Sequence, residues 1–480
     1  MKANDVQRRD FIKQTGIYTA GLLLGGSGSM PPTKENRNKG KSLEAIREAV
    51  YLTPMVDAHE HLYPESFRLS GERMIGRQCN DWTILLNHYL NSDMIVAGMS
   101  NEDYRMFFSP DTDPVDKWKY LEPIWQETKF TGYAQAVRLT LKELYDIEDI
   151  SASSVPRLQE AYERLLVKGF YKNVLQGSKA NIESCQVDPL IDYPVLRSEY
   201  PEFIMSDLKA NSFVSDPGNA KLANEAGIIP ATLQDWHQVI DYWFDRYGKY
   251  VVGIKVSLAY GRRIDFQPTE AEKVSDTCHQ ILQGQPVDGE DRKALEDHLF
   301  WYVVNKATEF NLPVKIHLGY LAGQDRMDLA NVRTNPGDAT MLCRQGPHAR
   351  FVFFHISYPY YEEMLAVAKH YSNAYIDMCW SWIINPVSAQ EFLKKFIVTV
   401  PSNKLIVFGG DYRVAESTVG HAIITRDGIA RALDDLVTEK YITEKEALGL
   451  IDPLLRDNCH KIFSLAEKST LLKGLDWSKL

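Results

Sequence analysis

The chain has 480 residues, 44% of them hydrophobic and 25% charged, which is ordinary for a globular protein and long enough for more than one domain. A net charge of −10 and the lack of Lys/Arg-rich runs argue against a nucleic-acid partner bound by general electrostatics. Six scattered cysteines without C-x-x-C spacing indicate neither a disulfide framework nor a cysteine zinc site, and no apolar run in the body could span a bilayer.

The first 45 residues differ from the rest of the chain. A basic stretch at residues 7–13 precedes a short apolar run at 16–26, which is typical of an export signal. The paired Arg8 and Arg9 resemble a twin-arginine signal, so we expect a signal over residues 1–30 and a periplasmic or exported protein. An ordinary N-terminus of a cytoplasmic protein is the alternative. Residues 31–45 are polar and basic, and their composition predicts a linker.

From residue 56 onward, short β-branched runs alternate with helical patterns, which is typical of β-α units and a parallel sheet. Eight such units predict an α/β fold, a closed (β/α)₈ TIM barrel over residues 46–470. A helical insertion is expected at 64–177, and further helices at 291–311 and 360–371 and, after the last strand, at 427–440 and 443–465. The expected strands are 55–58, 180–187, 202–205, 251–257, 313–318, 351–355, 374–378 and 404–411.

Two histidines, His59 and His61, stand at the end of the first expected strand, in PMVDAHEHL. Side chains two residues apart in a strand point to the same face, so both imidazoles are expected to aim at one point. Neutral imidazole is the commonest protein ligand of a divalent metal. Two histidines that stand close by chance are the alternative interpretation.

Other polar residues also stand where expected strands end. Lys255 lies in the fourth strand, His317 ends the fifth, His355 ends the sixth and Asp411 ends the eighth. Each one alone has a structural explanation, such as a capping aspartate or a lysine paired with a carboxylate. Barrel enzymes carry their active sites at the carboxyl ends of the strands. The common position of these residues therefore predicts one functional site.

The motifs DAHEHL, GIKVS, VKIHL, FFHIS and VFGGDYR together resemble the metal-dependent amidohydrolase superfamily, over about residues 55–465. The stretch HISYPYYEEMLAVAKHYSNAYIDMCW, with GGDYR and VGHAI, is similar to the branch of uronate isomerases and of amidohydrolase-like domains joined to glutamine-synthetase-like proteins. NHYLNSDMIVAGMS, in the insertion, is similar to uronate isomerase architecture.

The resemblance implies that His59, His61 and Asp411 bind a divalent ion, with His317 as a further ligand. Zinc is the expected metal, and manganese or iron are alternatives. Asp411 would take a proton from metal-activated water, and His355 would stabilise negative charge on the substrate carbonyl. One ion is favoured. In members with two ions a carboxylated lysine bridges them, and Lys255 with His317 and His355 would then hold the second.

The substrate is expected to be a small molecule that carries a carboxylate. Arg413, two residues past Asp411, could clamp that carboxylate in bidentate fashion. Arg262 and Arg263 are weaker candidates, and His421 of VGHAI could shape the site. Aromatic residues could wall the pocket or simply pack the loops: Tyr358, Tyr360, Tyr361, Trp380 and Trp382.

The expected function is therefore metal-dependent hydrolysis of a C–O or C–N bond in a lactone, ester or amide of a small acidic or sugar-derived compound. A uronate-type aldose–ketose isomerase and a decarboxylase use the same site residues and remain alternatives, as does a non-catalytic binding barrel. The expected export favours hydrolysis, because uronate isomerisation serves intracellular catabolism. A homo-oligomer is possible.

Overall fold

The computed structural model describes residues 34–70, 80–177, 179–190 and 193–480, and residues 42–480 form one compact unit. The export signal predicted for residues 1–30 lies outside these ranges. The linker predicted for 31–45 is helical from Lys34, because helix α2 spans Lys34–Leu52. None of the described helices is both long and apolar enough to cross a membrane.

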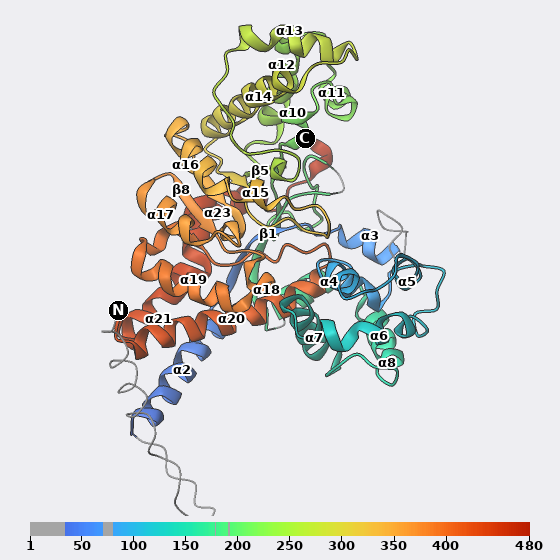
Figure 1. The fold of residues 1–480 in the computed structure, drawn as a ribbon, viewed down its shortest axis with the longest axis vertical. Coiled ribbons are helices and arrows are strands. Elements are labelled where there is room, and N and C mark those ends of the chain that lie inside the picture. The colour runs from blue at the N-terminus through green and yellow to red at the C-terminus, as the bar shows by residue number, and fades with distance from the viewer. Residues whose placement is uncertain (1–33, 71–79, 178, 191–192) are drawn as a thin grey trace, which may run out of the picture. The chain divides into compact units, whose positions relative to one another are not determined.

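The unit of residues 42–480 is built around parallel strands that hydrogen-bond in chain order (Figure 1). All eight expected strands are present, the third of them in two pieces, β3 and β4. Every strand is buried along most of its length, as expected where helices cover a parallel sheet. The strands are β1 Met55–Glu60, β2 Ile182–Val187, β3 Ile204–Ser206, β4 Leu208–Lys209, β5 Ile254–Val256, β6 Val314–Ile316, β7 Phe351–Phe353, β8 Ala374–Asp377 and β9 Leu405–Ile406.

Hydrogen bonds between backbone groups close these strands into a barrel. β3 and β4 are separated only by Asp207, and the Val252 amide donates to the Ser206 carbonyl at 3.0 Å, so the sheet continues toward β5. On the other side, the Ala58 amide of β1 donates to the Phe408 carbonyl, just after β9, at 3.0 Å. The (β/α)₈ barrel predicted from the sequence is therefore confirmed.

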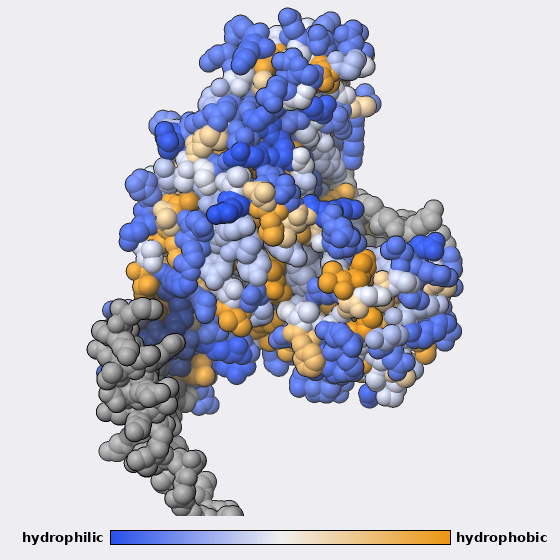
Figure 2. Space-filling view, viewed as in Figure 1, coloured by the Kyte–Doolittle hydropathy of each residue, from blue (hydrophilic) through white to orange (hydrophobic). Residues whose placement is uncertain are grey.

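The helices that follow the strands agree with the predicted ones in α14 and α17. The helix predicted for 427–440 is the second half of the longer α20, and the one predicted for 443–465 is broken into α21, a π-helical turn and α22. The helices are α10 Asn211–Ser215, α11 Ala220–Ala226, α12 Leu233–Tyr247, α13 Ala271–Leu282, α14 Gly289–Glu309, α15 Leu329–Val332, α16 Asn335–Gln345, α17 Glu362–His370, α18 Ser381–Ile384, α19 Pro386–Thr399, α20 Ala415–Thr438, α21 Glu444–Asp452, the π turn Pro453–Asp457, α22 Asn458–Phe463 and α23 Leu465–Leu472. The outer face over α11 to α14 is largely hydrophilic in Figure 2.

The early start of α20 has a packing cause. Glycine is unfavourable inside a helix, yet α20 contains Gly420 and Gly428. A Cβ at Gly420 would lie 1.8 Å from the Ala136 carbonyl oxygen of α7 (Gly132–Tyr145), and a Cβ at Gly428 would lie 2.3 Å from the Trp382 ring. The glycines therefore allow α20 to contact α7 and α18 closely, and these contacts stabilise the helix.

The insertion between β1 and β2 is helical, as predicted for residues 64–177. Its helices lie beside α18 and α20 (Figure 1). A buried ion pair also joins it to the barrel: Arg68 donates to both Glu416 oxygens at 3.0 and 2.8 Å and to the Tyr162 hydroxyl at 2.9 Å. The insertion contains α3 Glu65–Ser70, η1 Trp82–Leu86, α4 Leu90–Val96, α5 Asn101–Phe107, α6 Trp118–Thr128, α7 Gly132–Tyr145, α8 Val155–Leu165 and α9 Phe170–Gly177.

Glu183 on β2 gives the fold a specific sensitivity to acid. Its carboxylate accepts hydrogen bonds from His460 Nε2 at 2.7 Å and Arg456 Nε at 2.8 Å. The bond from His460, helped by Arg456 and opposed by burial, lowers the pKa of Glu183 from 4.5 to about 2. A lowered pKa in the folded state stabilises the protein above pH 4.5, and this contribution is lost as the pH falls from 4.5 to 2.

We expect Glu183→Gln to lower the free energy of unfolding by about 1 kcal/mol at pH 7, because a partly exposed pair is screened by solvent. As the pH falls from 4.5 to about 2, the difference from the unaltered protein should disappear. Urea unfolding at a series of pH values measures both effects. Glu290→Gln, at an exposed position in the first turn of α14, is the matched control. Parallel pH profiles of the Glu183→Gln variant and the unaltered protein would contradict the prediction.

Candidate metal centre

Two imidazoles and one carboxylate meet at the carboxyl end of the barrel. His59 lies in β1, His61 follows it directly, and Asp411 lies after β9. Asp411 Oδ1 is 3.3 Å from His59 Nε2 and 3.2 Å from His61 Nε2. One ligand atom from each of the three residues lies within 4.8 Å of the other two, a spacing that could hold a metal ion. The structure thus brings together the histidine pair and the aspartate that the sequence placed at opposite ends of the chain.

Strand β1 also holds the backbone that carries Asp411. The Asp411 amide donates to the His59 carbonyl at 2.8 Å, and the Tyr412 amide donates to the Glu60 carboxylate at 2.6 Å. A Cβ at Gly410 would lie 2.0 Å from Glu60 Oε1, so this approach requires glycine. The turn places Asp411 in the left-handed region, at φ 60°. Strained backbone of this kind is frequent at functional sites, where the surrounding structure enforces it.

The hydrogen bonds of His61 fit a metal ligand. Its Nδ1 donates to the Asp188 carbonyl oxygen at 2.9 Å, which leaves Nε2 with a lone pair. That lone pair faces Asp411 Oδ1 at 3.2 Å, so two acceptors point at each other. A cation between them would remove the repulsion. Metal-binding histidines usually donate their second ring nitrogen to a carbonyl or carboxylate, as His61 does here.

Burial and neighbouring charges give these residues the protonation states that metal ligands need. Burial, followed by the nearby Lys255 charge, lowers the pKa of His59 well below its usual value. Burial opposes the ionisation of Asp411, but His59 and His61 outweigh it and hold the pKa of this carboxyl well below its usual value. These shifts favour neutral imidazole at His59 and an ionised carboxylate at Asp411, and this pair fits a divalent cation.

His317 and His355 lie next to this group, but they face each other. His317 Nε2 donates to the Tyr320 carbonyl at 3.0 Å, so its Nδ1 is the acceptor for His355 Nε2 at 3.1 Å. Within residues 34–70, 80–177, 179–190 and 193–480, neither candidate metal group contains His317. The structure therefore does not bring His317 to the ion position predicted for it. His355 Nε2 lies 3.8 Å from Asp411 Oδ2, at the edge of the site.

Lys255 on β5 differs from the other lysine inside the barrel. Lys315 Nζ donates to the Ala58 carbonyl, Gln186 and Asp207 at 2.6–3.0 Å and ties strands together. Lys255 is only 1% exposed, yet its Nζ has no hydrogen-bond acceptor in the described part of the chain. Burial lowers its pKa. Its Nζ instead lies 3.8 Å from the centre of the Phe354 ring, so Lys255 does not tie strands together by hydrogen bonds as Lys315 does.

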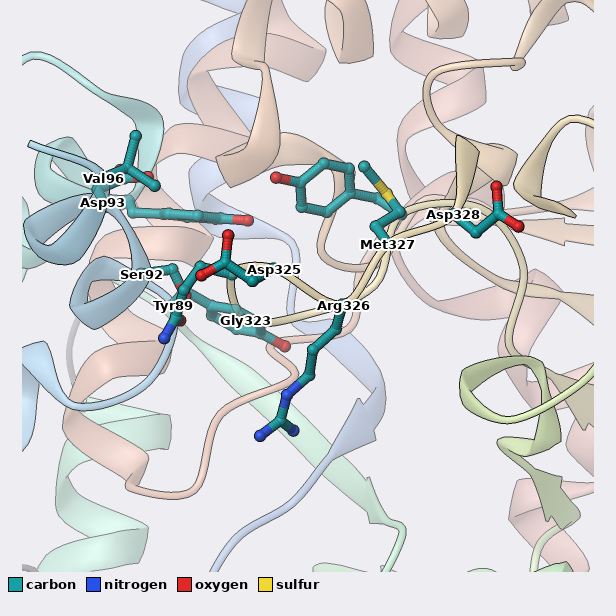
Figure 3. A pocket seen from close by; sticks show the side chains of 12 residues that line it. Tyr89, Ser92, Asp93, Val96, Gly323, Asp325, Arg326, Met327 and Asp328 are labelled. Carbon is teal, nitrogen blue, oxygen red and sulfur yellow. The ribbon is translucent and has the colours of Figure 1, made fainter. Parts of the chain in front are cut away.

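Two cavities, with volumes of about 720 and 370 Å³, are both lined by Tyr89, which contacts the centre. Both lie between the start of α4 and the loop after β6, and Figure 3 shows Tyr89 and Ser92 on one side and Gly323 and Arg326 on the other. The smaller cavity is also lined by His88 and Arg413. Tyr89 connects cavity and centre, because its hydroxyl donates to the Asp411 carbonyl at 2.8 Å.

The residues predicted to line the pocket differ in where they lie in the structure. Arg413 lines the smaller cavity, and its buried Nε lacks a hydrogen-bond acceptor among the described residues. Arg262 and Arg263 form ion pairs with Glu296, Asp297 and Asp338. Trp380 stacks on Tyr89 with ring centroids 4.6 Å apart, whereas Trp382 is core and donates to the Val407 carbonyl. His421 Nδ1 donates to the Gly410 carbonyl at 3.0 Å and so supports the turn before Asp411.

Several residues of the site were not predicted from the sequence. Asp188 is the first residue after β2, and Cys379 is the second residue after β8. A search for polar residues at strand ends could therefore have found both. His88 and Tyr89 come from the insertion, between η1 and α4, where no periodic pattern marks them. Only the aromatic and histidine content of NHYL was a signal for them.

Comparisons with known proteins give one family match and one curated relative. Residues 282–443 match the family model described as Amidohydrolase. Protein fluG from Emericella nidulans is 27% identical over 229 residues, which cover 45% of this chain and 26% of fluG, well under two thirds of its length.

Solved structures show the same fold. The uronate isomerase of Thermotoga maritima matches with a TM-score of 0.70 at 14% identity, over 88% of this chain and 97% of that one. The glucuronate isomerase of Caulobacter crescentus matches with a TM-score of 0.67 at 15% identity, over 91% and 97%. With the barrel and its strand-end residues, the family match confirms the resemblance to the amidohydrolase superfamily that the sequence motifs indicate.

Proposed function

We propose that the chain is a metal-dependent hydrolase of a lactone, ester or amide in a small acidic or sugar-derived compound. The observation that carries the proposal is the carboxylate of Asp411, which lies 3.2–3.3 Å from two imidazoles. The Asp411 backbone carbonyl accepts the hydroxyl of Tyr89, and Tyr89 and Arg413 line the smaller cavity. The match to the amidohydrolase family supports an enzyme of this superfamily. Substrate and reaction are the proposed part.

His59, His61 and Asp411 are the residues that would hold one divalent ion, with zinc favoured by the two imidazoles. When bound, such an ion supplies Lewis-acid chemistry, which makes a carbonyl more electrophilic and a water more acidic.

Three side chains of the chain itself would act on the substrate. Asp411 is ionised and buried, so it can accept the proton of the attacking water and return it to the leaving group. His355 is buried and neutral because burial lowers its pKa, and a substrate carbonyl would compete with His317 for its Nε2 proton. Arg413 offers guanidinium donors to a substrate carboxylate at the wall of the smaller cavity.

A uronate-type isomerase is the second candidate, and the likeness to two uronate isomerase structures favours it. Asp411 would then move a proton between neighbouring carbons of an open-chain sugar acid. The predicted export signal favours hydrolysis, since a sugar acid is isomerised where it is catabolised. The two reactions need the same residues around the centre, so the substrate decides between them.

The deciding experiment supplies zinc-, manganese- or iron-loaded protein with glucuronate and, separately, with a panel of sugar lactones and acyl amino acids. Hydrolysis of at least one lactone, ester or amide, without ketose formation from glucuronate, is the expected result. Ketose formation from glucuronate would replace the hydrolase by the isomerase. A protein that binds no metal and converts nothing would remove both.

Arg413→Lys is expected to raise KM by about 10–100-fold for a panel compound that carries a carboxylate, because lysine cannot form the two parallel hydrogen bonds of a guanidinium. The methyl ester of the same compound lacks the negative charge and is the matched control, with KM changed less than threefold. Steady-state kinetics of both compounds measure the effect. An equal loss for acid and ester would show that Arg413 does not bind the carboxylate.

A further inference from the structure

We propose a second metal position beside the first, formed by His355, Cys379 and Asp411, in which the thiolate of Cys379 is a ligand. The proposal rests on the proposed metal centre and extends it, because the two positions share Asp411. One ligand atom from each of the three residues lies within 4.8 Å of the other two, and all three residues are buried. They stand after three consecutive strands, β7, β8 and β9.

The backbone directs the three side chains toward the proposed ion position, and this requires strained backbone conformations. His355 has φ 60°, Cys379 φ 38° and Asp411 φ 60°, so all three lie in the left-handed region that disfavours non-glycine residues. Gly409 keeps space for the sulfur. A Cβ at Gly409 would lie 2.8 Å from Cys379 Sγ and 3.0 Å from His59 Cβ. The Cys379 sulfur therefore lies close to the strand that carries the first pair of ligands.

Lys255 lies close to this position, with its Nζ 3.8 Å from the centre of the Phe354 ring. Its charge interacts with Asp188 and also with Asp411 and Cys379. Binding of a metal to Cys379 breaks the S–H bond and releases the proton to solvent. The resulting thiolate would give Lys255 a further anionic neighbour. His355 Nδ1 is also buried without a partner in the described ranges, so this imidazole keeps a lone pair for an ion.

The chemistry of the three ligands selects a class of metal. Thiolate and imidazole favour Zn²⁺, Co²⁺ or Cd²⁺ over Mg²⁺ or Mn²⁺. His59 and His61 make the first position independent of sulfur, so the first ion should bind there and the second should follow when metal is in excess. His355 is also the group proposed to face the substrate through Nε2, whereas the second ion would bind its Nδ1.

The test is a Co²⁺ titration of the full chain after its metal has been removed. The first equivalent should bind without a thiolate-to-cobalt charge-transfer band in the near ultraviolet, and the second should produce that band. Cys379→Ser should abolish the band and reduce bound cobalt from two ions per chain to one. Cys278→Ser, which removes another buried free cysteine, in α13, should keep both ions and the band.

Each other outcome contradicts a defined part of the proposal. Two ions without the band, a band that persists in Cys379→Ser, or only one ion would overturn the second position alone. No bound ion would overturn the first centre as well. If Cys379→Ser does not fold, X-ray absorption of the unaltered protein with two equivalents of zinc still tests whether a sulfur atom binds the metal. A sulfur neighbour at about 2.3 Å from zinc is expected, and its absence overturns the proposal.

Discussion

Replacing Asp411 with asparagine is expected to lower kcat/KM by about 10³–10⁴-fold for the compound that the panel identifies. The change keeps the size of the side chain but removes its negative charge, so the side chain can no longer accept a proton from the attacking water. It also removes the only carboxylate that the described residues place between His59 and His61. Metal content should therefore fall together with activity.

Steady-state kinetics and metal analysis of the same samples measure the effect. Asp276→Asn, at an exposed position on α13, is the matched control and should keep both activity and metal. Full activity in Asp411→Asn would show that another group handles the proton. Loss of metal with full activity would show that the reaction does not use the ion.

The ion pair between Arg68 and Glu416 should have the largest effect on stability. Both side chains are fully buried, and the pair links α3 of the insertion to the first turn of α20. Arg68→Met or Glu416→Leu alone is expected to lower the free energy of unfolding by about 3–5 kcal/mol, because each leaves one charge buried without its partner. The double variant should recover most of that loss, since neither charge remains.

Urea unfolding followed by fluorescence measures the four proteins of this cycle. Glu160 and Arg164 provide the control, because their pair is one turn apart on α8 and both side chains are about two thirds exposed. Breaking it with Glu160→Ala should cost less than about 0.5 kcal/mol. If Glu416→Leu lowered the free energy of unfolding by as little as Glu160→Ala does, the buried pair would not hold the insertion in place.

The fold was largely predictable because its signals are local. Buried parallel strands appear in the sequence as short β-branched and aromatic runs, and all eight were located within a few residues. The length of α20 was not predictable in the same way. Its first half contains Gly420, and only the close contact with Ala136 of α7 shows why a helix forms there. That contact joins residues far apart in the chain.

The site was predictable only in part, from the rule that barrel enzymes carry functional residues at the carboxyl ends of their strands. Polar residues at strand ends predicted one functional site at the end of the barrel where His59, His61 and Asp411 meet. The rule says nothing about side-chain rotamers or hydrogen bonds, and these decide that His317 turns to His355 and Tyr320 rather than to the ion position. Residues from the insertion and from the loop after β6 were missed because nothing in their local sequence shows that they fold back over the barrel.

Glu60 is the residue between the two histidines, and its carboxylate also accepts the Thr418 hydroxyl of α20 at 2.6 Å. The parts that would hold an ion are thus stabilised by each other and by α20, whereas the cavity walls belong to α4 of the insertion and to the loop after β6. We expect the loop at residues 320–328 to be exchangeable for another sequence without altering how the ion is held. Substrate preference could then change in evolution, or by engineering, while the reactive machinery stays as it is.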